Sequence, residues 1–366
     1  MSGAAMSATR VGLFGHGWWA RRYLAPALSG AGAELVALCG RDGARAAKAA
    51  VEFGVPRSFD RIEAMLESVE LDALVITSPP SSHAEAVRAA AAARLPIFCE
   101  KPLGRTAQET AGMVTACAGL PTVAGFTQRW NPAIRTARRL LAEGAVGRLR
   151  HVRYSTASAL SSDATAPWDW RYDADEYAYG VLSDLGPHAV DVVRWLGGEI
   201  TEVTAAAHTV FAERSTPDGQ AKKVENWDEC SVTVRLADGV RASMFVSRML
   251  PVSPYRRFHH QLEIVGSAGT LAYDSDRPVE VTLSHPGGRP SVVRADGLDT
   301  GDAEPGSFEE LMAVMDAGAA AQARDMLAVF GGQTPGDVPT LADGHTGQLV
   351  LDAAARSATA QAWIRC

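Results

Sequence analysis

The sequence predicts an α/β protein of two domains. Residues 1–128 are expected to form a doubly wound parallel sheet, and residues 129–366 an α+β domain with a large, mostly antiparallel sheet that is open on one face. Three observations predict this architecture. The 366-residue chain is longer than one ordinary core supports. Short β-branched runs alternate with amphipathic stretches in the first third, and longer runs of alternating polarity follow.

The first domain is predicted from alternating strand and helix patterns. The strand-like runs are RVGLFG, ELVALC, ALVIT, PIFCE and TVAGF, and the helix-like stretches between them cover 43–53, 61–69, 83–94 and 106–118. Such alternation is typical of βαβ units with right-handed crossovers, and therefore of a parallel sheet.

The second domain is predicted from longer runs that alternate apolar and polar residues and end in turns such as Asp238-Gly239. Strands are expected at 149–158, 200–212, 229–236, 240–248, 259–266 and 279–284, and helices at 132–143, 187–196, 306–329 and 343–362. Alternation of this kind favours an antiparallel sheet with one covered face.

Composition excludes several functions. A net charge of −7 disfavours nucleic acid and anionic membrane surfaces as partners. No apolar run approaches the ~20 residues that span a bilayer, and the first ten residues lack an apolar signal core, so we expect a cytoplasmic protein. The five cysteines are odd in number and form no C-x-x-C motif, which favours reduced thiols over a disulfide or zinc framework.

The stretch GHGWWA directly follows the first strand. Gly15 would permit the tight turn and Gly17 the close approach of backbone N–H groups to a pyrophosphate, with His16 and Trp18 beside them. A helix that begins here would favour the phosphates. We therefore predict a dinucleotide-binding (Rossmann) domain, and an ordinary βα turn is the alternative.

The end of the second strand bears on the choice of cofactor. Gly40 stands where an NAD-specific protein usually has an acidic residue, and Arg41 follows it. A guanidinium suits a 2′-phosphate, so the pattern favours NADP. NAD remains the alternative, because Asp42 could turn toward the ribose.

Two further strands end in chemically distinctive residues. TSPPSSH contributes Ser78, Pro79 and His83, and CEKPLG contributes Glu100 and Lys101. Ligands of open α/β sheets bind beyond the carboxyl ends of the strands, so these residues are expected in the cofactor crevice. The proline after Lys101 restricts its backbone and allows a cis peptide bond.

The second domain carries an acid and a base near one helix start. In GVLSDLGPHAVD, Asp184 precedes His188 by four residues, Pro187 suits the first helical turn, and Asp191 lies one turn further on. A histidine near a helix N-terminus is biased toward its neutral form, as a general base requires. A capping aspartate and a buried histidine are the structural alternative.

An aromatic stretch precedes this pair. It contains Trp168, Trp170, Arg171, Tyr172, Tyr177 and Tyr179. Aromatic faces stack on the C–H faces of sugar rings, so Trp168 and Tyr179 are predicted to contact substrate, although simple packing is the alternative. Adjacent His259 and His260 would point to opposite faces of a strand, so we expect no metal site.

These stretches, together with GFTQRWNPAI (125–134), resemble the Gfo/Idh/MocA family of NAD(P)-dependent oxidoreductases along nearly the whole chain. The resemblance implies a catalytic trio of Lys101, Asp184 and His188, with Asp191 holding the helix. It also implies that Trp170 and Arg171 reach the nicotinamide half of the cofactor, and it makes Gln128 a candidate for the substrate pocket. The run EYAYG (176–180) departs from the small residues that relatives often have there, which weakens inferences about substrate.

The expected function is NADP(H)-dependent hydride transfer to or from a secondary alcohol or ketone of a sugar, polyol, cyclitol or amino sugar. His188 would act as general acid and base, while Lys101 stabilises charge on the substrate oxygen and Asp184 orients the substrate or tunes both groups. Two alternatives remain open: a non-catalytic dinucleotide-binding sensor or repressor, and a redox-neutral, nicotinamide-dependent glycoside hydrolase.

We also expect a homodimer or homotetramer. Helices can cover only one face of the predicted second sheet, and five apolar strand residues have no assigned burial: Val203, Ala205, Ala207, Met244 and Val246. A two-fold pairing of the open face would bury an apolar patch.

Overall fold

The structure is a computed structural model that describes residues 8–159, 161–250, 258–296, 298, 301, 303–304 and 306–366. Most of the N-terminal stretch on which the cytoplasmic expectation depends lies outside the described residues. The chain forms two compact units. The first comprises Met1–Gly104, Gln108–Gly125 and Gly318–His345, and the second comprises Arg105–Ala107, Phe126–Ala317 and Thr346–Cys366. The predicted domain boundary between residues 128 and 129 stays a prediction. None of the described helices is long and apolar enough to cross a membrane.

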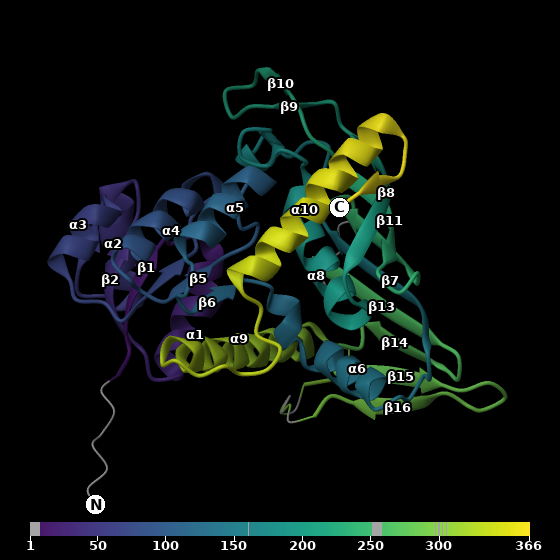
Figure 1. Cartoon of the computed structure of the whole chain (residues 1–366). Coiled ribbons are helices and arrows are strands. Elements are labelled where there is room, and N and C mark those ends of the chain that lie inside the picture. Colours follow the sequence, from purple (N-terminus) through teal and green to yellow (C-terminus); the bar gives the residue numbers. More distant parts are fainter. Residues whose placement is uncertain are drawn as a thin grey trace, which may run out of the picture. The chain divides into compact units, whose positions relative to one another are not determined.

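The first unit contains a six-stranded sheet in the order β3-β2-β1-β4-β5-β6. Figure 1 labels β1, β2, β5 and β6 of this sheet. All neighbours pair in parallel. The strands are β1 (Arg10–Phe14), β2 (Glu34–Cys39), β3 (Ser58–Phe59), β4 (Ala73–Ile76), β5 (Ile97–Cys99) and β6 (Thr122–Ala124). Successive strands are added toward one edge from β1 to β3 and toward the other edge from β4 to β6, and such sheets bind dinucleotides at this switch point between β1 and β4. The predicted Rossmann architecture is confirmed.

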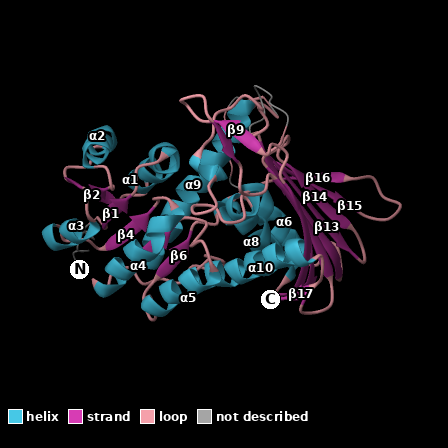
Figure 2. Cartoon of the chain, turned by 90° about the horizontal axis from the view of Figure 1, so that it is seen from above, coloured by secondary structure: helices cyan, strands magenta, loops and turns pink. Residues whose placement is uncertain are grey.

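Helices cover both faces of this sheet, with α1 and α2 on one face and α3, α4 and α5 on the other (Figure 2). Their bounds are α1 (Ala25–Gly30), α2 (Gly43–Phe53), α3 (Ile62–Ser68), α4 (His83–Ala92) and α5 (Ala107–Ala116). Because both faces are covered, β4 and β5 are buried along their whole length. Side chains that could reach a ligand are therefore confined to the loops at the ends of β4 and β5.

The second unit contains a nine-stranded sheet in the order β16-β15-β14-β13-β7-β12-β11-β8-β17. Only β7 and β12 pair in parallel. The strands are β7 (Leu149–Ser158), β8 (Ile200–His208), β11 (Glu229–Leu236), β12 (Arg241–Ser247), β13 (Phe258–Gly266), β14 (Thr270–Asp274), β15 (Glu280–Ser284), β16 (Ser291–Arg294) and β17 (Ile364–Arg365). A separate hairpin joins β9 (Glu213–Ser215) to β10 (Ala221–Lys223). The predicted mostly antiparallel sheet is confirmed.

Helices of the second unit pack on one face of its sheet. α6 (Pro132–Ala142) contacts β14 and β15, and α8 (Gly186–Gly197) contacts β7 and β12. α7 (Val181–Asp184) also belongs to this unit, whereas α9 (Phe308–Phe330) and α10 (Leu341–Ala360) each contribute residues to both units. Figure 2 shows no described helix against the other face, so the sheet is open on that side as predicted.

Two details of the second sheet differ from the sequence-based expectation. The strand expected at 200–212 ends at His208, because the buried carboxylate of Asp228 accepts the backbone N–H of Val210 at 2.8 Å and draws the chain out of the ladder. The sequence analysis also missed β14, β16, β17 and the β9–β10 hairpin, which are short and follow turns closely.

The burial of the five apolar strand residues corrects one argument for oligomerisation. Val203, Met244 and Val246 are buried in the core of the second unit, and Ala205 and Ala207 pack against it. These side chains therefore belong to the covered face, and they provide no apolar patch for the open one.

Candidate active site

The glycine turn has the geometry that a phosphate cradle requires. Gly15 has φ +108°, and a Cβ there would lie 2.5 Å from the backbone nitrogen of Ser78, so only glycine fits. A Cβ on Gly17 would meet no atom within 4 Å, which leaves its backbone open to a ligand. Trp18 is 62% exposed beside this turn, and a π-helical turn, Ala20–Leu24, follows. The residues present fit a dinucleotide pyrophosphate.

The end of β2 presents a basic rather than an acidic side chain. Asp42 caps α2, because its Oδ1 accepts the backbone N–H of Arg45 at 3.0 Å. Arg41 is exposed. A Cβ on Gly40 would lie 2.7 Å from the His16 ring, so His16 occupies the space beside Gly40. The Asp42 carboxylate is therefore engaged by the start of its own helix.

The loop after β4 is tied to the loop after β5 by His83. This imidazole is fully buried, and its Nε2 lies 2.7 Å from the carbonyl oxygen of Ser78. Its Nδ1 lies 3.1 Å from the carbonyl oxygen of Pro102. Burial lowers the pKa of His83. Because both ring nitrogens face backbone carbonyls, the structure favours a positioning role for His83 over the predicted cofactor contact. Ser78 and Pro79 precede it on the same loop, at the carboxyl end of the sheet.

Glu100 and Lys101 lie at the carboxyl end of β5, as expected. The Lys101–Pro102 peptide is cis. The Lys101 backbone N–H donates to Glu100 Oε2 at 3.0 Å, and the same carboxyl group lies against Gly125, where a Cβ would approach its Cδ to 2.7 Å. Glu100 Oε1 is buried and makes no hydrogen bond of ordinary geometry to a described residue, although the Trp19 side chain interacts with this carboxyl group. Such an acceptor suits a ligand hydroxyl.

Glu100 should make the ligand-free protein less stable as pH rises. Burial raises its pKa from 4.5 to about 7. The unfolded chain releases this proton first, so stability is full below about pH 4.5 and falls until about pH 7, by up to about 3 kcal/mol at 1.4 kcal/mol per pH unit. Glu100→Gln should remove this loss. We expect the stability difference between variant and wild type in urea unfolding to grow from pH 4.5 to 8.

Glu67→Gln, on the exposed side of α3, is the matched control and should show no such trend. A constant difference between Glu100→Gln and the wild type across this pH range would contradict the assignment of a buried, proton-binding carboxyl group.

Asp184 and His188 lie on consecutive helices of the second unit. Asp184 ends α7 and is 6% exposed, and His188 lies in the first turn of α8 and is 9% exposed. Pro187 occupies the first turn of α8, as predicted. Asp191 is 1% exposed, and Arg129 Nη2 donates to its Oδ1 at 2.7 Å while Nε donates to Oδ2 at 2.9 Å. This bidentate ion pair fixes α8 to the turn at Thr127–Trp130.

The segment before α7 holds the predicted cofactor-binding pair in place. Asp169 accepts the backbone N–H of Arg171 at 3.0 Å and begins a short turn, Trp170–Tyr172. The guanidinium of Arg171 lies 4.4 Å from the centre of the Trp170 ring and is attracted electrostatically by Asp184. Trp170, Arg171 and Asp184 therefore belong to one local cluster.

The predicted substrate-contacting side chains have different surroundings. Trp168 is held by the β9–β10 hairpin, because its indole N–H donates to the carbonyl oxygen of Lys223 at 3.3 Å. Tyr179 stacks on Trp227 at 6.4 Å, and burial together with Asp352 raises its pKa to about 12. The interaction with Asp352 directs the Tyr179 hydroxyl group toward α10. Gln128 Oε1 is buried without a partner in the described structure, which leaves it suited to a ligand.

The structure thus brings the predicted residues together in two groups, one in each unit. Gly15, Ser78, Glu100 and Lys101 share the carboxyl edge of the first sheet, and Trp170, Arg171, Asp184 and His188 gather around α7 and α8. Sequence reasoning missed the buried residues that hold the second group, which are Arg129, Asn226 and Arg248. In the sequence, each of these residues is distinguished only by being a charged or polar residue beside an apolar strand or a turn.

The adjacent histidines of β13 have different partners. His260 Nδ1 lies 3.2 Å from the hydroxyl of Tyr154, and His259 Nε2 lies 2.9 Å from Asp274 Oδ1. His259, Asp274 and Asp276 place potential ligand atoms within 4.8 Å of one another. Asp274 also accepts the backbone N–H of Asp276 in a turn, which accounts for the arrangement structurally.

Comparison with known proteins covers both units. The sequence profile of the "Oxidoreductase family, NAD-binding Rossmann fold" matches residues 9–125, and that of the "GFO/IDH/MocA C-terminal domain" matches residues 134–272. An inositol 2-dehydrogenase of Acidothermus cellulolyticus is 32% identical over 332 residues, which cover 89% of this chain and 85% of that protein. A D-xylose 1-dehydrogenase (NADP(+)) of Haloferax volcanii is 36% identical over 182 residues, which cover 49% of this chain and 54% of that protein.

A solved structure is also similar along nearly the whole chain. It is a levoglucosan dehydrogenase in complex with NADH, with a TM-score of 0.87 and 25% sequence identity, and the match covers 98% of this chain and 99% of that one. The likeness therefore extends to both sheets and to the helices that carry the two groups of candidate residues.

Proposed function

Because the chain belongs to the Gfo/Idh/MocA family of oxidoreductases, we propose that it transfers a hydride between NADP(H) and a secondary alcohol or ketone of a sugar, polyol, cyclitol or amino sugar. The names of its relatives support the substrate class, since they include dehydrogenases of levoglucosan, D-xylose and inositol. The observation that carries the proposal is the dinucleotide cradle at Gly15 and Gly17, combined with an acid–base pair at Asp184 and His188.

The proposed cofactor site uses the carboxyl edge of the first sheet. The backbone around Gly15–Gly17, with His16 and Trp18, would hold the pyrophosphate. Ser78 and Pro79 would line the crevice, and Glu100 Oε1 would accept a ribose hydroxyl. Trp170 and Arg171 would face the nicotinamide half. A bound nicotinamide cofactor supplies or accepts the hydride, which no side chain of the protein can do.

The proposed catalytic groups move the proton that accompanies the hydride. His188 would take the hydroxyl proton during oxidation and return it during reduction, since an imidazole titrates near neutral pH. The Lys101 ammonium would donate a hydrogen bond to the same substrate oxygen and stabilise its developing negative charge. Asp184 would orient the substrate or tune Lys101 and His188. Gln128, Trp168 and Tyr179 are the further substrate contacts that we propose.

The preference for NADP is tested by Arg41→Ala. We expect this change to weaken NADPH binding by roughly 10-fold to 100-fold and NADH binding hardly at all, because a hydrogen bond to a charged group is lost from only one of them. Fluorescence titration with both cofactors measures the effect. Arg57→Ala, an exposed arginine bonded to the carbonyl oxygen of Ser68, is the matched control. Equal losses for both cofactors, or a wild-type preference for NADH, would defeat the NADP assignment.

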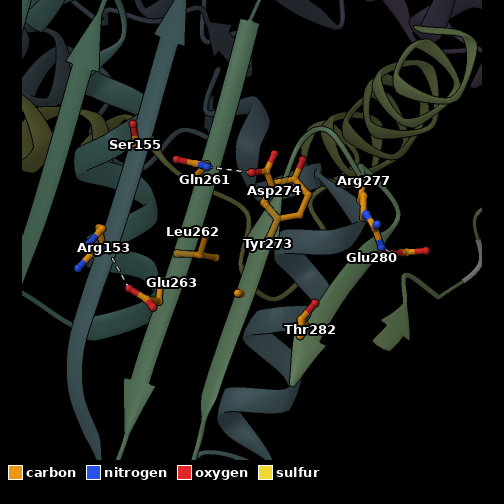
Figure 3. Close-up of a pocket in the computed structure, with 11 residues that line it drawn as sticks. Arg153, Ser155, Gln261, Leu262, Glu263, Tyr273, Asp274, Arg277, Glu280 and Thr282 are labelled. Carbon is orange, nitrogen blue, oxygen red and sulfur yellow. Dashed lines mark hydrogen bonds and ion pairs between the residues drawn. The ribbon is translucent and has the colours of Figure 1, made fainter. Parts of the chain in front are cut away.

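We propose that two copies of the chain pair through the open face of the second sheet. A shallow hollow lies on this face, lined by Arg153, Gln261, Glu263, Asp274, Arg277 and Glu280 (Figure 3). Several of these side chains already pair, such as Arg153 with Glu263 at 3.2 Å. Phe245, 38% exposed, lies on β12 near the middle of the same sheet. The interface would therefore be polar with an aromatic centre.

Light scattering should give a mass of two or four times the 38.7 kDa of one chain. Phe245→Arg should lower that mass by placing a charge in the interface. Val51→Arg, at an 83% exposed position on α2, should leave it unchanged. A wild-type mass near 38.7 kDa at micromolar concentration would contradict the proposal.

A further inference from the structure

Arg248 is a fully buried cation directly after β12. Its side chain is 0% exposed, and its guanidinium donates three hydrogen bonds. Nη1 donates to the carbonyl oxygen of Arg171 at 3.1 Å. Nη2 donates to Asn226 Oδ1 at 2.9 Å and to the carbonyl oxygen of Trp227 at 2.8 Å. Its Nε is buried and makes no hydrogen bond to a described residue. Burial of an arginine is costly unless its charge and its donors are satisfied, so the three bonds made by Nη1 and Nη2 have to offset much of that cost.

These contacts connect Arg248 to the start of α7. The carbonyl oxygen of Trp227 also accepts the backbone N–H of Val181, the first residue of α7, at 2.8 Å. Gly180 precedes it with φ +56°, and a Cβ there would lie 2.3 Å from the same oxygen and 2.9 Å from Arg248 Nη2. The chain thus passes directly over the guanidinium at Gly180, four residues before Asp184.

Arg248 also secures the opposite end of the aromatic segment. Asn226 Nδ2 donates to the carbonyl oxygens of Arg171 and Tyr177, at 2.9 and 3.0 Å, while its Oδ1 accepts from Arg248. One guanidinium therefore fixes both the turn that carries Arg171 and the segment that enters α7.

The charge of Arg248 acts on the same residues. Its strongest electrostatic attraction is to Asp184, followed by Asp228, whose Oδ1 lies 3.8 Å from Nη2. With no solvent around it, this attraction is screened far less than it would be at the surface. Arg171 attracts Asp184 as well. Both guanidinium groups therefore attract the Asp184 carboxylate.

We propose that Arg248 is a positioning residue for the reaction. Its directed hydrogen bonds hold the Arg171 turn and the start of α7, the helix that ends in Asp184, while its buried charge attracts the Asp184 carboxylate. The inference rests on the proposed catalytic role of Asp184. Arg248 belongs to none of the sequence patterns that predicted the site, which are the glycine turn, the stretch CEKPLG and the pair of Asp184 and His188. Small displacements of reacting groups cost about 10²-fold in rate, so the effect should fall on kcat.

Arg214 provides a matched control within the same unit. It is 3% exposed and donates to the carbonyl oxygens of Ser161, Asp163 and Ala166. Like Arg248 it stacks on Tyr172, at 4.8 Å against 5.4 Å. It holds the neighbouring segment around 161–166, which contains no proposed catalytic residue.

The test compares Arg248→Gln and Arg214→Gln for urea stability, kcat and KM, with NADP⁺ and whichever of levoglucosan, D-xylose and inositol the wild type oxidises fastest. We expect both variants to lose stability, and only Arg248→Gln to lose about 10²-fold in kcat at similar KM. In the Asp184→Asn background, Arg248→Gln should lower kcat by a smaller factor than it does alone, because one of the two groups that it is proposed to position has already lost its charge. Crystal structures should show the Asp184 carboxylate displaced in Arg248→Gln alone.

Equal losses of kcat in the two variants would overturn the inference. So would a loss of kcat from Arg248→Gln that is as large in the Asp184→Asn background as in the wild type. In either case Arg248 would contribute only to stability. If Arg248→Gln does not fold, Arg248→Lys takes its place, because it keeps the charge but cannot make the three directed bonds. Near-normal turnover by Asp184→Asn itself would instead refute the proposed role of Asp184.

Discussion

Replacing His188 by alanine should lower turnover by at least about 10²-fold, the usual contribution of a positioned acid or base. Lys101→Ala should have an effect of similar size, because it removes the group proposed to stabilise charge on the substrate oxygen. NADPH affinity should change little for His188→Ala, since His188 is proposed to contact the substrate and transfer its proton, and is assigned no contact with the cofactor. Steady-state kinetics and fluorescence titration measure both quantities.

His208→Ala is the control for this pair, since His208 is an exposed histidine at the end of β8 in the same unit as His188. It should retain wild-type turnover. Near-normal turnover of either the His188 or the Lys101 variant would remove that residue from the mechanism.

Replacing Asp191 by alanine should destabilise the protein by about 3–5 kcal/mol, the usual cost of removing one partner from a buried ion pair. Arg129 is 8% exposed and Asp191 1%, so the guanidinium would lose its carboxylate in a site that water scarcely reaches. Because the pair fixes α8, which carries His188, turnover should fall as well. Urea unfolding measures the loss of stability.

The exposed pair between Arg139 and Glu143 on α6 is the control. Its N–O distance is also short, at 2.9 Å, but the two side chains are 43% and 54% exposed. Glu143→Ala should cost no more than about 0.5 kcal/mol, as exposed helix pairs do. If Asp191→Ala cost equally little, the buried pair would not be what holds α8.

Much of the fold follows from patterns that are local in the sequence. The β-branched runs of the first unit became β1, β2, β4, β5 and β6, because a strand covered on both faces needs an uninterrupted apolar run. The helix start at Pro187 and the glycine turn at Gly15 depend only on neighbouring residues, so each could be recognised from a few positions.

The parts that could not be predicted depend on distant contacts. The faces to which Val203 and Met244 point are set by strand register, and the sequence alone did not reveal it. The end of β8 at His208 depends on Asp228, twenty residues further on. Arg248 holds a segment that begins more than seventy residues earlier in the chain, and no local pattern marks a buried guanidinium. The strand and helix ends that carry the candidate residues were therefore predicted, whereas the residues that hold these segments in place were not.

The central claim is net hydride transfer between NADP(H) and a sugar or cyclitol. Absorbance at the reduced-nicotinamide band, recorded with NADP⁺ and levoglucosan, D-xylose or inositol, tests it most directly. We predict that NADPH accumulates in proportion to the ketone or lactone formed from at least one of these compounds, and faster than NADH does with NAD⁺. Conversion of a sugar without any net change in the cofactor, or no conversion of any of them, would contradict the account.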